Sequence, residues 1–177
     1  MTVALPHTPD RARLGVLVFL ATEVMFFAGL FSALVVLSPV KSMQLDVALA
    51  SAMTAMLVGS SVALHVALLR RTAARAQALL LAFVALLLGA LFLATMTYEW
   101  SVLLTAGHLP ATDLWHACFY VLTGVHGLHV LVGVLWLAAG WVGLARGSHG
   151  RALELGALYW HFVDAVWLLL FWKLYLA

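Results

Sequence analysis

The stretch that decides the fold is LGVLVFLATEVMFFAGLFSALVVL, residues 14–37, an apolar run whose single ionisable residue is Glu23. A helix needs about 20 consecutive apolar residues to cross the hydrocarbon layer of a bilayer. Four similar runs follow, and none shows the alternating pattern of a membrane barrel strand. We therefore predict five transmembrane helices, at approximately residues 10–38, 44–70, 74–99, 113–146 and 151–176.

The composition also indicates a membrane protein. Of the 177 residues, 66% are hydrophobic and only 9% are charged, whereas soluble domains are about half apolar and about one quarter charged. A soluble fold of this length has too little interior to bury so much apolar surface. This excludes a soluble enzyme, a secreted disulfide scaffold and a disordered chain. We expect a single all-α integral membrane domain over residues 1–177, with no nucleic-acid partner because the charges lie between apolar runs.

The basic residues predict an orientation. All seven arginines would fall on one side of a five-helix bundle and both lysines on the other. Cytoplasmic loops carry an excess of Lys and Arg, so we expect a cytoplasmic N-terminus and an outside C-terminus. Glu99 and Asp113 are then expected in the outer loop, with Asp113 capping the fourth helix.

Six ionisable residues lie within or beside the apolar runs: Glu23, His126, His129, Glu154, His161 and Asp164. Such groups are costly in a bilayer, so each needs a partner or a function. A helix rises about 1.5 Å per residue, which puts four of them within one or two turns of the midplane: Glu23, His129, His161 and Asp164. We therefore predict one buried polar cluster shared by the first, fourth and fifth helices.

Spacing alone leaves three interpretations of this cluster open. It is a set of hydrogen bonds that holds helices in register, a proton relay, or a metal or haem site. Glu23 is either a reactive, proton-exchanging acid or a neutral carboxyl that donates a hydrogen bond. Because an isolated carboxylate is costly in hydrocarbon, we expect Glu23 to be protonated and hydrogen-bonded across helices.

Three segments resemble the haem-copper oxidase (cytochrome c oxidase) subunit III family in its five-helix form. They are LATEVMFFAGLF at 20–31, TGVHGLHV at 123–130 and YWHFVDAVW at 159–167. The three occur in order along most of the chain, with the expected helices between them, which makes the resemblance specific.

The resemblance implies a non-redox accessory subunit of a proton-pumping terminal oxidase, cytochrome c oxidase of aerobic respiration. Haem and copper would lie in partner subunits, with no catalytic residue, cofactor or metal in this chain. The expected partners are subunit I directly, subunit II, smaller subunits and membrane phospholipid. By the same likeness, the chain supports the stability and proton uptake of subunit I.

The resemblance also implies roles for single residues. Glu23 matches the family's buried carboxyl that reacts with carbodiimides. Arg146 matches a lipid-phosphate-binding arginine, and Arg70, Arg71 and His65 are further candidates for lipid headgroup contacts.

Other functions remain open at this point. Within the family, the alternatives are a quinol oxidase subunit III and an accessory protein of nitric oxide reductases. A membrane haem or metal protein is the alternative outside it. The composition, rich in Ala, Leu and Arg, favours a bacterial inner membrane that the chain crosses several times.

Overall fold

The computed structural model describes residues 10–37 and 40–177. Within them the chain forms five α-helices: α1 (Arg11–Leu37), α2 (Val47–Arg70), α3 (Arg75–Thr105), α4 (Leu114–Ala145) and α5 (Arg151–Phe171). A π-helical turn, η1 (Trp172–Leu176), continues α5. Counting α5 and η1 as one span, each helix is long and apolar enough to cross a membrane. The prediction of an all-α protein with five such helices is confirmed.

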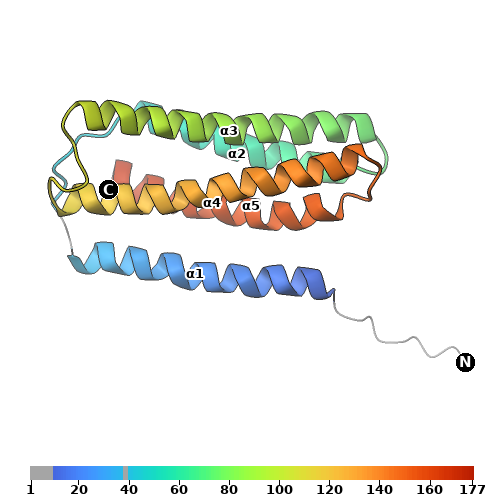
Figure 1. Cartoon of the computed structure of the whole chain (residues 1–177), viewed down its shortest axis with the longest axis horizontal. Helices are drawn as coiled ribbons and strands as arrows, with labels where there is room; N and C mark the ends of the chain where they lie inside the picture. Colours follow the sequence, from blue (N-terminus) through green and yellow to red (C-terminus); the bar gives the residue numbers. More distant parts are fainter. Residues whose placement is uncertain (1–9, 38–39) are drawn as a thin grey trace, which may run out of the picture.

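Helices α2 to α5 form a bundle, and α1 lies along one side of it (Figure 1). Helix α1 buries only Phe27 and Leu34. Helix α5 supplies the largest fully buried side chains, those of Trp160, Trp167 and Tyr159. The core therefore surrounds α5, whereas most of α1 faces outward.

Glycines bring neighbouring helices close together. A Cβ atom on Gly140 of α4 would lie 2.8 Å from the Cα of Leu153 in α5, so a side chain there would push the two backbones apart. The indole of Trp160 occupies the space beside Gly89 and Gly133, where added Cβ atoms would lie 2.6 and 2.7 Å from it. Small residues permit such close packing in membrane bundles.

The helix ends follow local signals in the sequence. Asp46 and Asp113 cap α2 and α4, and each accepts a hydrogen bond from the backbone N–H three residues later. Gly147 follows the end of α4 with φ of 99°, a conformation that favours glycine. These ends need only local hydrogen bonds, so short-range sequence patterns predict them.

The prediction that Glu99 lies in the outer loop is wrong. Helix α3 continues to Thr105, beyond the predicted end at residue 99. Glu99 is 5% exposed, and its Oε2 accepts a hydrogen bond from the Tyr175 hydroxyl at 2.8 Å. The helix continues because Trp100 and Leu103 still pack against the core. A buried partner from η1 lets the acid lie inside the bundle.

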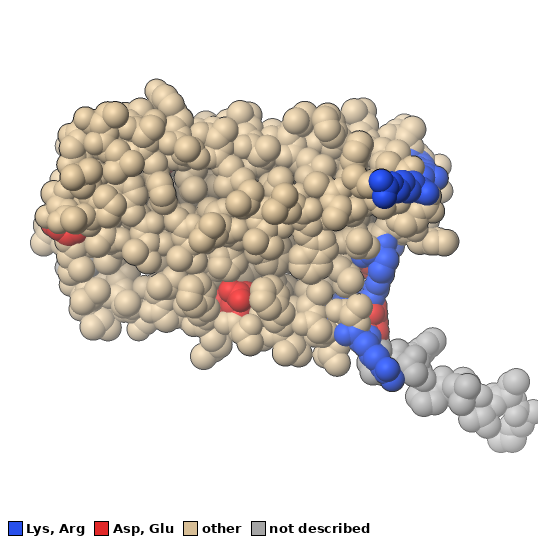
Figure 2. Space-filling model, viewed as in Figure 1, with Lys and Arg blue, Asp and Glu red and all other residues tan. Residues whose placement is uncertain are grey.

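Charge is unevenly distributed along the bundle. Figure 2 shows the visible Lys and Arg side chains gathered at one end. That end contains the starts of α1, α3 and α5 and the ends of α2 and α4. Arg75 closes the end of α4 there, because it donates hydrogen bonds to the carbonyl oxygens of Leu144 and Ala145 at 2.6 and 3.0 Å.

Candidate functional site

Glu23 of α1 and His129 of α4 meet across a helix interface. Oε2 of Glu23 lies 3.0 Å from Nε2 of His129, and both side chains are 18% exposed. The rings of Phe26 and Phe27 lie against the imidazole, with centroids 6.2 and 4.9 Å away. Helix α1 thus supplies both a polar partner for His129 and an aromatic cover over it.

The other nitrogen of His129 limits the protonation of this pair to two arrangements. Nδ1 lies 2.8 Å from the carbonyl oxygen of Val125, and a carbonyl only accepts, so Nδ1 carries a hydrogen. In a neutral ring Nε2 is then an acceptor, and the Glu23 carboxyl must donate to it. The alternative with the same proton count is an imidazolium facing a carboxylate. Separated charges are costly in hydrocarbon, so a protonated Glu23 stays the prediction, and the 3.0 Å contact is compatible with both arrangements.

His126 does not join this pair. It is fully buried, and neither of its ring nitrogens has a hydrogen-bond partner within the described residues. Its ring stacks on Trp167 with centroids 5.3 Å apart and meets Phe92 edge-on at 5.8 Å. His126 therefore packs as an aromatic side chain between α3 and α5.

His161 and Asp164 of α5 face α2 instead. The Ser61 hydroxyl lies between them, with Oγ 3.0 Å from His161 Nδ1 and its hydrogen donated to Asp164 Oδ2. Asp164 is 7% exposed, whereas His161 is exposed. His65 of α2 lies beside this group, with its ring centroid 6.3 Å from that of His161. Sequence reasoning missed Ser61, because a serine in an apolar run is usually only a small packing residue.

The prediction of a single polar cluster does not hold. One hydrogen bond joins Glu23 of α1 to His129 of α4. Separate hydrogen bonds join His161 and Asp164 of α5 to Ser61 of α2. Depth along each helix follows from counting residues, which is why the groups share a level. The rotation of each helix depends on packing, so the sequence did not show that they face different neighbours.

Glu154 lies at the arginine-rich end of the bundle. Its Oε2 is 3.2 Å from Arg71 Nη2 and 3.7 Å from Arg151 Nη1. Arg151 also pairs with Asp10 at the start of α1. Glu154 therefore belongs to a network of partly exposed ion pairs rather than to the intramembrane groups.

The four expected headgroup residues lie in different surroundings. Arg71 pairs with Glu154, and Arg70 donates a hydrogen bond to Gln77 at 2.7 Å. Arg146 is exposed at the end of α4. His65 lies further along α2, beside His161.

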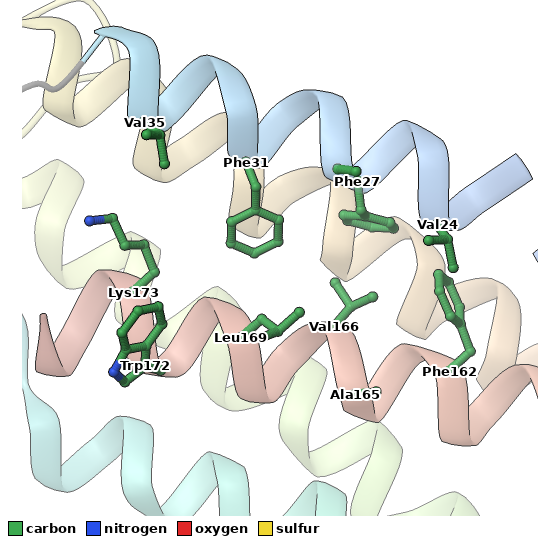
Figure 3. A pocket seen from close by; sticks show the side chains of 11 residues that line it. Val24, Phe27, Phe31, Val35, Phe162, Ala165, Val166, Leu169, Trp172 and Lys173 are labelled. Atoms are coloured by element: carbon green, nitrogen blue, oxygen red, sulfur yellow. The ribbon is translucent and has the colours of Figure 1, made fainter. Parts of the chain in front are cut away.

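A pocket of about 450 Å³ opens between α1 and α5 (Figure 3). Phe31 of α1 points toward α5, while Val166 and Leu169 of α5 point back toward α1. Lys173 supplies the charged group of an otherwise uncharged lining and lies beside Trp172 at the η1 end. The pocket is a long apolar space with a cation at one end.

Among residues 10–37 and 40–177, no group of three or more His, Cys, Asp or Glu side chains is arranged to hold a metal ion. The fold and the site define a class: a multi-pass α-helical membrane protein with acids and histidines hydrogen-bonded between its helices.

Comparison with known proteins identifies the family. The family model for cytochrome c oxidase subunit III matches residues 6–177. The chain is 33% identical to cytochrome c oxidase subunit 3 of Thermostichus vulcanus, over 98% of this chain and 92% of that protein. It is 33% identical to a probable cytochrome c oxidase subunit 3 of Nocardia farcinica, over 96% of this chain and 89% of that protein. It is 32% identical to cytochrome bo(3) ubiquinol oxidase subunit 3 of Pseudomonas aeruginosa, over 92% of this chain and 83% of that protein.

The chain belongs to the cytochrome c oxidase subunit III family, whose members are accessory subunits of haem-copper oxidases. The resemblance seen in the sequence is thereby confirmed.

Proposed function

We propose that this chain is the non-redox subunit III of a proton-pumping terminal oxidase and that it supports the stability and proton uptake of the catalytic subunit. Family membership supports the assignment. The structural observation that supports it is the contact between Glu23 of α1 and His129 of α4, where a carboxyl and an imidazole lie 3.0 Å apart between two membrane-length helices. Haem and copper then belong to the partner subunits.

Proton support is tested in the intact oxidase. We expect the complex with Glu23→Leu to lose activity faster during sustained turnover than the wild-type complex, with a slower uptake of protons. Glu23→Gln is the matched control, because its amide still donates a hydrogen bond to His129 but cannot exchange an acidic proton. Unchanged proton uptake and lifetime in both variants would contradict a role for this pair.

A cytoplasmic position is proposed for the arginine-rich end, in a bacterial inner membrane. The positive-inside rule and the grouping of charges in Figure 2 support it, as do the bacterial relatives. A periplasmic-type reporter fused to the C-terminus should then be active. An active cytoplasmic-type reporter at that site would show a cytoplasmic C-terminus and contradict the proposed topology.

Phospholipid is proposed as the occupant of the pocket between α1 and α5. Its apolar lining suits an acyl chain, and Lys173 lies where an anionic headgroup would end. Arg146, exposed at the opposite end, is proposed as a second headgroup contact. Ala165→Trp should fill the pocket and remove one retained lipid in native mass spectrometry of the complex. Leu87→Trp on the exposed side of α3 is the control, and equal lipid retention in both would refute the assignment.

A quinol-oxidising complex is the second candidate, favoured by the similarity to the ubiquinol oxidase subunit of Pseudomonas aeruginosa. Assaying the purified complex with cytochrome c and with a quinol separates the two candidates.

A further inference from the structure

The seam between α2 and α5 carries polar groups that the described part of the chain does not satisfy. We call it the His161 seam and define it by His65, Ser61, His161 and Asp164. His65 and His161 are exposed on the outer side of the bundle. Oδ1 of Asp164 is buried and has no hydrogen-bond partner within the described residues. Polar groups left in this state are costly in a membrane.

Ser61 and His161 of the seam lie inside the hydrocarbon layer, whereas His65 is only about 7.5 Å along α2 from Arg70 and lies nearer the headgroups. A helix rises about 1.5 Å per residue, so His161 is about 15 Å along α5 from Arg151, and Ser61 is about 13 Å along α2 from Arg70. Both arginines belong to the charged end of the bundle, and the hydrocarbon layer is about 30 Å thick. Lipid headgroups do not reach this depth. The seam therefore faces either acyl chains or another protein.

The hydrogen bonds define what the seam presents outward. The Ser61 hydroxyl contacts both Asp164 Oδ2 and His161 Nδ1, so the inner ring nitrogen of His161 already has a partner. The outer nitrogen, Nε2, is a donor or an acceptor according to the tautomer, and it is polar in both. No group in the described residues forms a hydrogen bond with it. An acyl chain forms no hydrogen bonds, so the seam is complementary to a protein side chain that does.

At the contact between α1 and α4, the outer nitrogen of a histidine has a partner. There, Glu23 satisfies the Nε2 atom of His129, and the rings of Phe26 and Phe27 cover the contact. The His161 seam has an equivalent imidazole but no covering helix among the described residues.

We propose that the His161 seam is the contact surface for a transmembrane helix of a partner oxidase subunit, which places a hydrogen-bonding side chain against Nε2 of His161. The inference rests on the proposed function, because it requires a partner within the membrane. Val62, which follows Ser61 and is 58% exposed, provides apolar contact area beside the polar groups. Transmembrane helices associate through such packing and interhelical hydrogen bonds.

Photo-crosslinking in the purified oxidase tests the surface directly. A photoreactive phenylalanine analogue at Val62 should form an adduct with a transmembrane segment of a partner subunit, located by peptide mass spectrometry. The same analogue at Leu87, 53% exposed on α3, measures background labelling at a similar depth. Adducts with lipid alone at Val62 would overturn the inference while leaving the proposed function intact. Failure of the chain to copurify with any oxidase subunit would overturn both.

Substitution of His161 tests the hydrogen bond itself. His161→Phe should weaken retention of the chain in the complex during detergent washing by about 3- to 10-fold, the effect expected for one transmembrane hydrogen bond. His161→Gln keeps a side chain that can donate or accept a hydrogen bond and should restore most of the retention. Leu87→Phe adds an aromatic ring without removing a polar group and should have no effect. Equal retention of His161→Phe and Leu87→Phe would contradict a hydrogen bond to the partner helix.

Discussion

The Nε2 atom of His129 lies 3.0 Å from the Oε2 atom of Glu23, and this contact joins α1 to the other helices inside the membrane. Helix α1 buries few side chains of its own, so this partly buried hydrogen bond contributes to where it docks. If the pair is neutral, Glu23 is the donor, because the second nitrogen of His129 already donates to a backbone carbonyl.

Replacing Glu23 by Leu should destabilise the docking of α1. Nε2 of His129 would lose its donor, at a cost of about 0.6–2 kcal/mol in free energy of unfolding. Glu23→Gln retains a donor and should cost less. Thermal unfolding in detergent compares the two variants.

Infrared difference spectra of the same variants test the protonation of Glu23. The wild type should show a protonated-carboxyl band that is absent from Glu23→Gln. Loss of a carboxylate band instead would show that the pair is ionised and that the proton resides on His129.

Tyr175→Phe should destabilise the η1 end of the bundle. The Tyr175 hydroxyl donates to Oε2 of Glu99, and Oε1 of Glu99 is already without a partner within the described residues. Leaving both oxygens unsatisfied should cost about 1–3 kcal/mol. In a double-mutant cycle, Glu99→Leu, which removes the acceptor, should reduce the cost of Tyr175→Phe. Additive effects of the two substitutions would mean that the contact contributes nothing.

Gly140→Val should separate α4 from α5. The Cβ atom alone would approach the backbone of Leu153 to 2.8 Å, and overpacking of this kind costs about 1–3 kcal/mol. Gly29→Val is the matched control, because an added Cβ there meets no atom within 4 Å. The unfolding temperature should fall for Gly140→Val and change little for Gly29→Val. A reversed order would refute the close approach of the two helices.

Asp113 gives the connection between α3 and α4 a dependence on pH. Hydrogen bonds from Ser42 and from the backbone and ring of His116 hold the pKa of Asp113 well below its usual range. Because the folded-state pKa lies below the unfolded value of about 3.9, Asp113 stabilises the fold above that pH. The contribution is lost as the pH falls toward the folded-state pKa. Asp113→Asn should therefore flatten the acid limb of a plot of unfolding temperature against pH, and an unchanged limb would contradict this.

Features set within one stretch of the sequence were predictable, whereas the contacts between helices were not. Apolar run length predicts the five spans, and the cap at Asp113 follows from a short-range hydrogen bond. The common depth of Glu23 and His129 follows from residue counting. Their contact, and the separate contact of Asp164 with Ser61, depend on how each helix is rotated against its neighbours. Rotation is set by close packing, as at Gly140, which spacing along one helix does not reveal.

Purification through an affinity tag on this chain, in mild detergent, is the measurement that tests the assignment most directly. We expect a haem-copper catalytic subunit to copurify in an amount equal to that of this chain. When stronger detergent separates the two, the haem absorption should stay with the catalytic subunit. A chain that purifies alone, or that keeps stoichiometric haem or metal after separation, would contradict a non-redox accessory subunit.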